Sequence, residues 1–387
     1  MFERTFVRLG GEIGSCSRLT STFNPFIFHG VPFGTCYPVS KRPMPKLDSY
    51  LQACIDRKGS DLHIASESPV YLRLLGRLTP LTENPLSIQE CEELIFEILD
   101  AAMGERLKTE WEIDTAYTMA NGERFRVNAF RQRRGWDAVF RHFSSKVASI
   151  DQLGLPPILK KFADANQGLI LITGPGRCGK STTCAALVDY LNSESDEHII
   201  TIEDPIEYIH QRKKSLVNQR SVGPHTASFS AALRSALRED PDIIMVGEMR
   251  DTETMSLALT AAETGHLVIG TLHTGSAAAT ISRVVNLFPA SEQSQAVASL
   301  SESLVGIISQ RLLVNAEGTA MVPAFEILVN SLAMANTIRD SDTHKIPSLI
   351  ATGGSQGMQS MDASLRSMVA STRITQAQMD EIMAEET

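Results

Sequence analysis

Residues 174–181 combine glycines with a lysine and a serine at a spacing that suits the binding of a polyphosphate. They read Gly-Pro-Gly-Arg-Cys-Gly-Lys-Ser and fit the pattern G-x-x-x-x-G-K-[ST]. Gly174 and Gly179 permit tight turns, so successive backbone N–H groups can face the phosphates. Lys180 would then reach the β- and γ-phosphates, and Ser181 would bind Mg²⁺. We therefore predict a nucleotide-binding loop made of Gly174, Pro175, Gly176, Arg177, Cys178, Gly179, Lys180, Ser181 and Thr182.

The residues on either side of this loop predict a strand before it and a helix after it. Leu169–Ile172 is an apolar run typical of a buried strand, and Thr182–Leu191 suits a helix. This order distinguishes the motif from a chance glycine-rich turn, and the start of the helix adds the positive end of its dipole. Arg177 and Cys178 stand where small residues are common. We expect Cys178 to be a tolerated small residue rather than a redox switch, and alkylation of its thiol to block nucleotide binding.

Acidic residues follow two further apolar segments downstream of the loop. His198–Ile202 predicts a strand that leads into Glu203-Asp204-Pro205-Ile206-Glu207, and Ile243–Val246 predicts one that ends in Gly247-Glu248. Ligands bind at the carboxyl ends of strands in α/β sheets, so both groups of carboxylates are candidates for holding Mg²⁺-bound water or orienting an attacking water. For the first group, a solvated acidic turn is an equally good interpretation.

A histidine follows the fourth apolar strand of this series, which we place at His266–Gly270. His273 could reach the γ-phosphate region and respond to its state. A lone histidine is more often structural than catalytic, so His273 is a candidate sensor only because of the other motifs.

Length and composition restrict the class of protein. A chain of 387 residues is long enough for about two domains, and its net charge of −9 argues against nucleic acid as the main partner. No apolar run approaches 18 residues, so we expect no membrane span. The cysteines have no C-x-x-C spacing, which predicts no zinc site and favours a reducing compartment. They are Cys16, Cys36, Cys54, Cys91, Cys178 and Cys184.

The pattern of apolar residues divides the chain into segments. Residues 1–43 lack periodicity, and we expect them to be disordered or spurious, with Met44 as the true start; a functional tail is the alternative. Residues 44–146 predict a small α+β domain, 147–156 a linker, and 157–387 an α/β domain with a parallel sheet that becomes mainly helical from about residue 290. In the first domain we expect helices at Leu47–Arg57 and Ile88–Leu107, and strands at 59–64, 70–75, 77–81, 122–130 and 136–143.

The motifs together resemble those of the secretion-superfamily hexameric ATPases, and within that family the branch that powers retraction of type IV pili. Residues 201–210 match its aspartate box, 243–251 its Walker B motif and 261–274 its histidine box. The similarity runs from Met44 to about residue 375. The resemblance implies a PAS-like domain followed by a RecA-like P-loop ATPase domain, assembled as a homo-hexamer with ATP and Mg²⁺ between the domains.

The resemblance also implies roles for single residues. Glu207 is implied as the general base, Glu248 as the Walker B acid and second-shell Mg²⁺ residue, and His273, with His266 as a weaker candidate, as the γ-phosphate sensor. Arginines of both domains are implied to close onto the nucleotide. They are Arg126 and Arg141 from the N-terminal domain and Arg234 and Arg250 from the ATPase domain.

Two features favour the pilus-retraction branch of the family over the pilus-assembly branch. The additional N-terminal domain and tetracysteine zinc element of pilus-assembly ATPases are missing, and residues 333–340 keep the frame of a retraction motif, with departures at Ala335 and Thr337. The implied protein is cytoplasmic and peripheral at the inner membrane, and drives twitching motility. Its implied partners are a platform protein at the pilus base and related pilus ATPases, without nucleic acid or membrane insertion.

Three other functions remain open from the sequence. The first is an ATPase of a type IV secretion or conjugation system, or an accessory pilus ATPase, in the same superfamily. The second is a nucleotide-gated scaffold without turnover, which the presence of Glu207, Glu248 and His273 argues against. The third is a DNA translocase, which the acidic charge balance disfavours.

Overall fold

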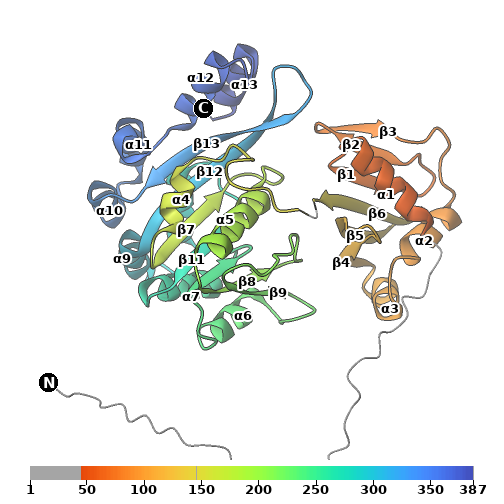
Figure 1. Ribbon diagram of the computed structural model, residues 1–387, viewed down its shortest axis with the longest axis horizontal. Helices are drawn as coiled ribbons and strands as arrows, with labels where there is room; N and C mark the ends of the chain where they lie inside the picture. Colours follow the sequence, from red (N-terminus) through yellow and green to blue (C-terminus); the bar gives the residue numbers. More distant parts are fainter. Residues whose placement is uncertain (1–44, 145, 387) are drawn as a thin grey trace, which may run out of the picture. The chain divides into compact units, whose positions relative to one another are not determined.

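A computed structural model describes residues 45–144 and 146–386, which form two sheets with their helices (Figure 1). Residues 1–43, which we expected to be disordered or spurious, lie outside the described residues. The first sheet is antiparallel, with strand order β3-β2-β1-β6-β5-β4. Its strands are β1 (Asp61–Ile64), β2 (Tyr71–Leu74), β3 (Arg77–Pro80), β4 (Glu112–Thr118), β5 (Arg124–Gln132) and β6 (Gly135–Phe143).

A two-residue turn joins β2 to β3. Leu75 and Gly76 both have positive φ, at 47° and 85°, as the tight hairpin turns that match strand twist require. The hairpin predicted around Gly76 is therefore present. β4 was not predicted, because its sequence Glu-Ile-Asp-Thr-Ala-Tyr-Thr carries few large apolar residues.

Three helices, α1 (Lys46–Asp56), α2 (Ile88–Phe96) and α3 (Ala101–Glu110), pack with the first sheet around buried Phe125 and Phe140. The prediction of one helix over 88–107 is wrong. The chain leaves the helix after Phe96, and Asp100 begins a new one by accepting a hydrogen bond from the Met103 N–H at 2.8 Å. The apolar period continues across this break, so periodicity alone did not reveal it.

The second sheet has seven strands in the order β13-β12-β7-β11-β10-β8-β9. β7 (Gly168–Thr173), β8 (His198–Glu203), β10 (Ile243–Val246) and β11 (Leu267–Leu272) lie parallel to one another, as predicted. An edge strand, β9 (Leu216–Ser221), adds to β8 and was missed because its sequence is largely polar.

The expectation of a mainly helical chain from about residue 290 is wrong for residues 304–329. β12 (Leu304–Val314) pairs parallel with β7, and β13 (Met321–Val329) returns antiparallel beside it. Gly306 allows this approach, because a Cβ there would lie 2.7 Å from the Leu328 carbonyl oxygen of β13. A continuous apolar run such as Leu-Val-Gly-Ile-Ile fits a strand or a buried helix equally well.

Helices cover both faces of the second sheet (Figure 1). Alternate residues of β7 separate the two faces: Leu169 and Leu171 join one core, and Ile170 and Ile172 the other. The first face packs against α6 (Phe229–Ala236), α7 (Thr252–Glu263), α8 (Ala277–Asn286) and α9 (Gln293–Ser303), and the second against α4 (Ile158–Ala163) and α5 (Lys180–Glu194). The C-terminal helices are α10 (Leu332–Arg339), α11 (Ile346–Thr352), α12 (Met361–Ala370) and α13 (Gln376–Glu386).

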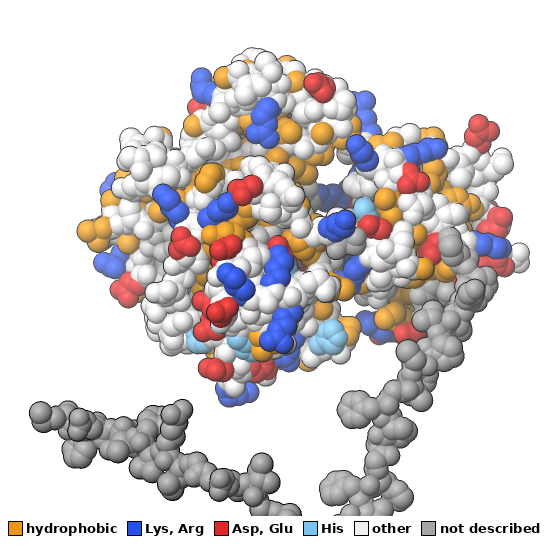
Figure 2. Space-filling view, viewed as in Figure 1, with side chains coloured by type: hydrophobic (Ala, Val, Ile, Leu, Met, Phe, Trp, Pro, Cys, Tyr) orange, Lys and Arg blue, Asp and Glu red, His pale blue; other side chains and the backbone are white. Residues whose placement is uncertain are grey.

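On the face shown in Figure 2, acidic and basic side chains are interspersed. None of the helices in the described part of the chain combines the length and the apolar character that a bilayer crossing requires.

Candidate functional site

The glycine-rich loop lies between β7 and α5, as predicted. All six residues of β7 are buried, and the chain then turns through Gly174, Arg177 and Gly179 at positive φ angles of 143°, 66° and 94°. Arg177 therefore holds a left-handed conformation that non-glycine residues rarely adopt. The thiol of Cys178 is buried inside the loop, and burial raises its pKa, which disfavours the reactive thiolate.

No side-chain hydrogen bond caps the start of α5. Its N-cap residue, Gly179, has no side chain to bind the first N–H groups. The Lys180 ammonium donates to the carbonyls of Gly174 at 2.8 Å and Pro175 at 2.9 Å, so it spans the loop. Burial lowers the pKa of Lys180, and neighbouring carboxylates oppose that effect. A phosphate would supply the negative charge that this buried cation lacks.

The loop after β8 contains two glutamates in different surroundings. Glu203 is buried and accepts hydrogen bonds from the Thr201 hydroxyl at 2.8 Å and the Gln219 amide at 3.0 Å. Its second oxygen accepts the Glu207 N–H at 3.4 Å, so Glu203 supports the turn that presents Glu207. Burial raises the pKa of Glu207, although the Ser181 hydroxyl and the charges of Arg126, Arg141 and Lys180 oppose that rise.

The loop after β10 places Glu248 between two donors. Arg250 binds it through two nitrogens at 2.5 and 2.6 Å, and the Nε2 of His273 lies 3.0 Å from the same carboxylate. The Nδ1 of His273 lies 3.3 Å from the Lys180 ammonium. A neutral imidazole with its proton on Nε2 satisfies both contacts, so His273 links the loop lysine to Glu248.

His266 lies away from this cluster. It stands before the first residue of β11, while Thr271 and Leu272 pair with the carboxyl end of β7. A six-residue strand is about 20 Å long, so the structure does not bring His266 to the loop. Its Nδ1 lies 3.1 Å from the carbonyl of Ala261 at the end of α7, which is a structural contact.

The four predicted arginines have different partners. Arg250 contacts Glu248, whereas Arg234 pairs with Glu253 on the neighbouring helix α7. Arg126 pairs with Asp114 at 2.6 Å and also lines a small hollow with Glu207. Arg141 pairs with Asp61 at 3.0 Å. The structure thus brings Arg250 to Glu248, and Arg126 and Arg141 close enough for their charges to act on Glu207. It does not bring Arg234 there.

Sequence reasoning missed two residues that touch the loop. Asp61 is 1% exposed and lies 3.7 Å from Arg177 as well as 3.0 Å from Arg141. Its pKa is lowered, because the Ser60 hydroxyl and these arginines outweigh the opposing effect of burial. Gln310, on β12, binds the loop from the other side. Neither belongs to a motif, so only a correct pairing of the strands could have identified them.

The residues present suit a magnesium ion bound together with a nucleotide. The Ser181 hydroxyl and the Glu207 and Glu248 carboxylates supply hard oxygen donors, and Ser181 already hydrogen-bonds Glu207. Within residues 45–144 and 146–386, no group of three or more acidic, histidine or cysteine side chains is placed to hold a metal by itself. Mg²⁺ commonly takes one or two protein ligands and completes its shell with phosphates and water.

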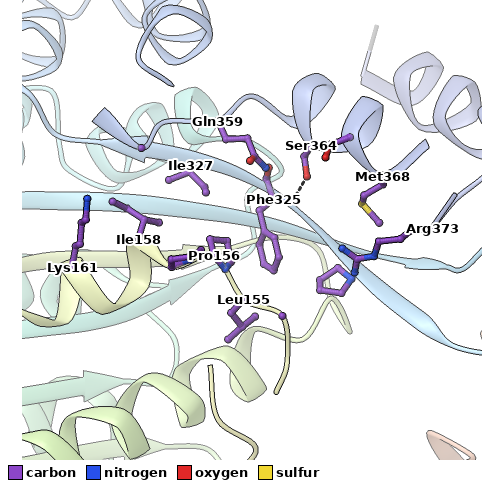
Figure 3. A pocket seen from close by; sticks show the side chains of 15 residues that line it. Leu155, Pro156, Ile158, Lys161, Phe325, Ile327, Gln359, Ser364, Met368 and Arg373 are labelled. Carbon is purple, nitrogen blue, oxygen red and sulfur yellow. Dashed lines mark hydrogen bonds between the residues drawn. The ribbon is translucent and has the colours of Figure 1, made fainter. Parts of the chain in front are cut away.

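A separate cavity of about 440 Å³ lies between residues 154–157, α4, β13 and α12. In Figure 3 the side chains of Leu155, Pro156 and Phe325 line it, and Ser364 accepts the backbone N–H of Phe325 at 3.1 Å. Its lining includes Lys161 and Arg373 but no residue of the four motifs. It is therefore not the candidate catalytic site.

A mostly parallel sheet with a phosphate loop between β7 and α5, and glutamates after β8 and β10, defines a P-loop nucleotide-binding protein. The chain belongs to the family of type II/IV secretion system proteins, whose sequence profile matches residues 41–387.

Within that family, the chain is similar to ATPases of type IV pili. The type IV pilus retraction ATPase PilT of Pseudomonas aeruginosa is 50% identical over 311 residues, which are 80% of this chain and 90% of that protein. The type IV pilus ATPase PilU of the same organism is 37% identical over 330 residues, 85% of this chain and 86% of that protein. The crystal structure of the pilus retraction motor PilT with bound ADP superposes with a TM-score of 0.77 at 40% identity, and covers 87% of this chain and 96% of that one. The predicted fold class of a mixed α/β protein agrees with this likeness.

Proposed function

We propose that this chain is an ATP-hydrolysing motor that powers the retraction of type IV pili. The convergence of Lys180, Glu248 and His273 around the phosphate loop carries the ATPase part of this proposal. The 50% identity to a retraction ATPase over most of both chains supports the pilus part.

The phosphate loop and the start of α5 are the proposed nucleotide-binding elements. The N–H groups of 174–182 would face the phosphates, and Lys180 would exchange its two carbonyl contacts for the β- and γ-phosphates. Ser181 would hold Mg²⁺, with Glu248 in the outer shell. The ion, when bound, neutralises charge on the β- and γ-phosphates.

Glu207 is the proposed general base. Burial raises the pKa of Glu207 above that of an exposed glutamate and so brings it closer to neutral pH. A general base accepts a proton from water more efficiently when its pKa lies nearer the working pH. Glu203 holds the Glu207 N–H and Ser181 holds its carboxyl group, so the base is fixed from two sides. An attacking water that hydrogen-bonds to Glu207 would lie beside the γ-phosphate bound by Lys180.

Arginines and His273 would complete the site. Arg126 and Arg141 would leave Asp114 and Asp61 to neutralise the charge that develops on the transferred phosphoryl group. Arg250, which contacts Glu248, is proposed as a contributor from the ATPase domain, and Arg234 would contribute only after leaving Glu253. His273 would report the γ-phosphate, because its contact with Lys180 must change when that lysine binds phosphate.

The motor is proposed to be a homo-hexamer at the cytoplasmic side of the inner membrane. We place the hinge in the linker 147–156, between a PAS-like domain over 44–146 and a RecA-like domain over 157–387. Domain closure on ATP and opening on product release would move the subunits and act on a platform protein at the pilus base.

Deletion of the gene and complementation with wild type or Glu207→Gln tests this proposal. Surface pili are counted by electron microscopy, and twitching is scored on the same cells. The proposal expects more pili and lost twitching in the deletion strain and in the Glu207→Gln strain, with recovery by wild type. Fewer pili would indicate an assembly motor, and unchanged pili would indicate another secretion system; both results contradict the proposal.

An accessory role in retraction is the second candidate. The departures at Ala335 and Thr337 fall on α10, within the retraction motif. An accessory ATPase would require a second motor for pilus retraction in the same cell, so recovery of twitching by this chain alone would exclude it.

A further inference from the structure

Gln310 is a polar side chain buried in the second sheet, 2% exposed, and both ends of its amide are bonded. Its Nε2 donates to the carbonyl of Cys178 at 2.7 Å, and its Oε1 accepts the Thr183 hydroxyl at 3.0 Å. Cys178 belongs to the phosphate loop and Thr183 to the first turn of α5. One side chain of β12 therefore connects the loop and the helix that follows it.

The backbone of β12 also approaches the loop closely. A Cβ at Gly174 would lie 2.3 Å from the Gln310 carbonyl oxygen, a distance that no side chain tolerates. A Cβ at Gly179 would lie 3.2 Å from the Gln310 Nε2. Both motif glycines thus face the same residue, and the glycine at 174 is required for β12 to come this near.

The contact with Cys178 fixes the direction of a peptide group. In a planar trans peptide the C=O and N–H point in opposite directions. Because the Cys178 carbonyl points to Gln310, the N–H of Gly179 points away from β12. N–H groups aligned in this way are what a phosphate-binding loop offers its ligand.

We propose that Gln310 is a positioning residue, which holds the phosphate loop in the arrangement that binds nucleotide. This inference rests on the proposed ATPase function. Gln310 lies about 130 residues beyond the loop and outside the four motifs, as their positions in the chain show. Its expected effect is on nucleotide affinity more than on turnover, because Glu207 and the arginines act on the reaction from other elements.

Ser309 provides a matched control on the same strand. Its hydroxyl lies 2.6 Å from that of Thr173, and both residues are fully buried. This hydrogen bond joins β12 to β7 and does not reach residues 174–183. A substitution of Ser309 therefore removes a buried hydrogen bond of β12 without freeing the Cys178 carbonyl.

The test measures binding of ADP carrying a fluorescent N-methylanthraniloyl group to full-length wild type, Gln310→Met and Ser309→Ala. Methionine has about the length of glutamine and cannot make either hydrogen bond. We expect Kd to rise about tenfold in Gln310→Met, which corresponds to about 1.4 kcal/mol, with kcat at saturating ATP within about threefold of wild type. In Ser309→Ala we expect a lower Tm and a Kd within about twofold of wild type.

An unchanged Kd in folded Gln310→Met would overturn the inference, and so would an equal rise in Ser309→Ala. If Gln310→Met does not fold, Thr183→Val replaces it, because that variant leaves the Gln310 amide held only at the loop. We expect its Kd to rise about threefold, and an unchanged Kd would again overturn the inference. Wild type that binds no nucleotide would instead refute the proposed function itself.

Discussion

The loop after β8 and the loop after β10 each place a glutamate close enough to Lys180 to act on its pKa, but the surroundings of the two glutamates differ. Glu207 is half-buried, and burial, which raises its pKa, is the main influence on that pKa. Glu248 contacts Arg250 and His273 directly, so its negative charge is matched by donors on two sides. The same side chain thus stands in two settings: burial at Glu207, where we propose proton acceptance, and direct pairing with Arg250 and His273 at Glu248.

The largest expected effect is on turnover in Glu207→Gln. Glutamine keeps the shape and the hydrogen bond to Ser181 but cannot take a proton, so we expect kcat to fall about 10³-fold. Phosphate release measures kcat, and the fluorescent nucleotide measures Kd, which should stay within about threefold. Near-normal turnover would remove Glu207 from the base role.

The second effect concerns Glu248→Gln. This variant loses the charge that pairs with Arg250 and His273 but leaves the base intact, so we expect kcat to fall about 30-fold. The Mg²⁺ concentration needed for half-maximal activity should rise in a titration at saturating ATP. A loss as large as in Glu207→Gln would erase the distinction between the two loops.

A smaller effect is a shift in pH dependence. A base works only when deprotonated, so kcat should fall as the pH drops through the raised pKa of Glu207, above the ordinary value of 4.5. Arg126 lowers this pKa by its charge. Arg126→Gln should therefore move the acid limb of the profile to higher pH. In Arg234→Gln, whose arginine pairs with Glu253, the limb should stay in place.

The smallest effect is expected for Tyr208→Phe. The Tyr208 hydroxyl lies 2.9 Å from that of Thr182 and joins the Glu207 loop to α5. Its loss should cost about 1 kcal/mol of stability and reduce kcat about threefold. Thr182→Val should lower stability and kcat by the same amounts. The double variant Tyr208→Phe/Thr182→Val should lose no more stability or kcat than either single variant, as measured by thermal unfolding and steady-state kinetics. Additive losses would show that the two hydroxyls act separately.

The sequence predicted the parts of the site that local pattern encodes. Lys180, Glu207 and Glu248 follow apolar segments, and the rule that parallel strands end at one edge brings them together. It could not predict Gln310 or Asp61, because their contacts depend on which strands pair. β12 was mistaken for helix since a buried strand and a buried helix share the same apolar run. The break before α3 was missed because the helical spacing of apolar residues continues across it, although Asp100 is a residue type that often caps the start of a new helix.

The central claim is that the base belongs to the loop after β8 and not to the loop after β10. The most direct measurement is kcat against pH, from about pH 5 to about pH 9, for Glu207→Gln and Glu248→Gln side by side with wild type. The account predicts that the acid limb disappears in Glu207→Gln, whose residual turnover is flat at low pH, and persists in Glu248→Gln. An acid limb that survives in Glu207→Gln and vanishes in Glu248→Gln would contradict it.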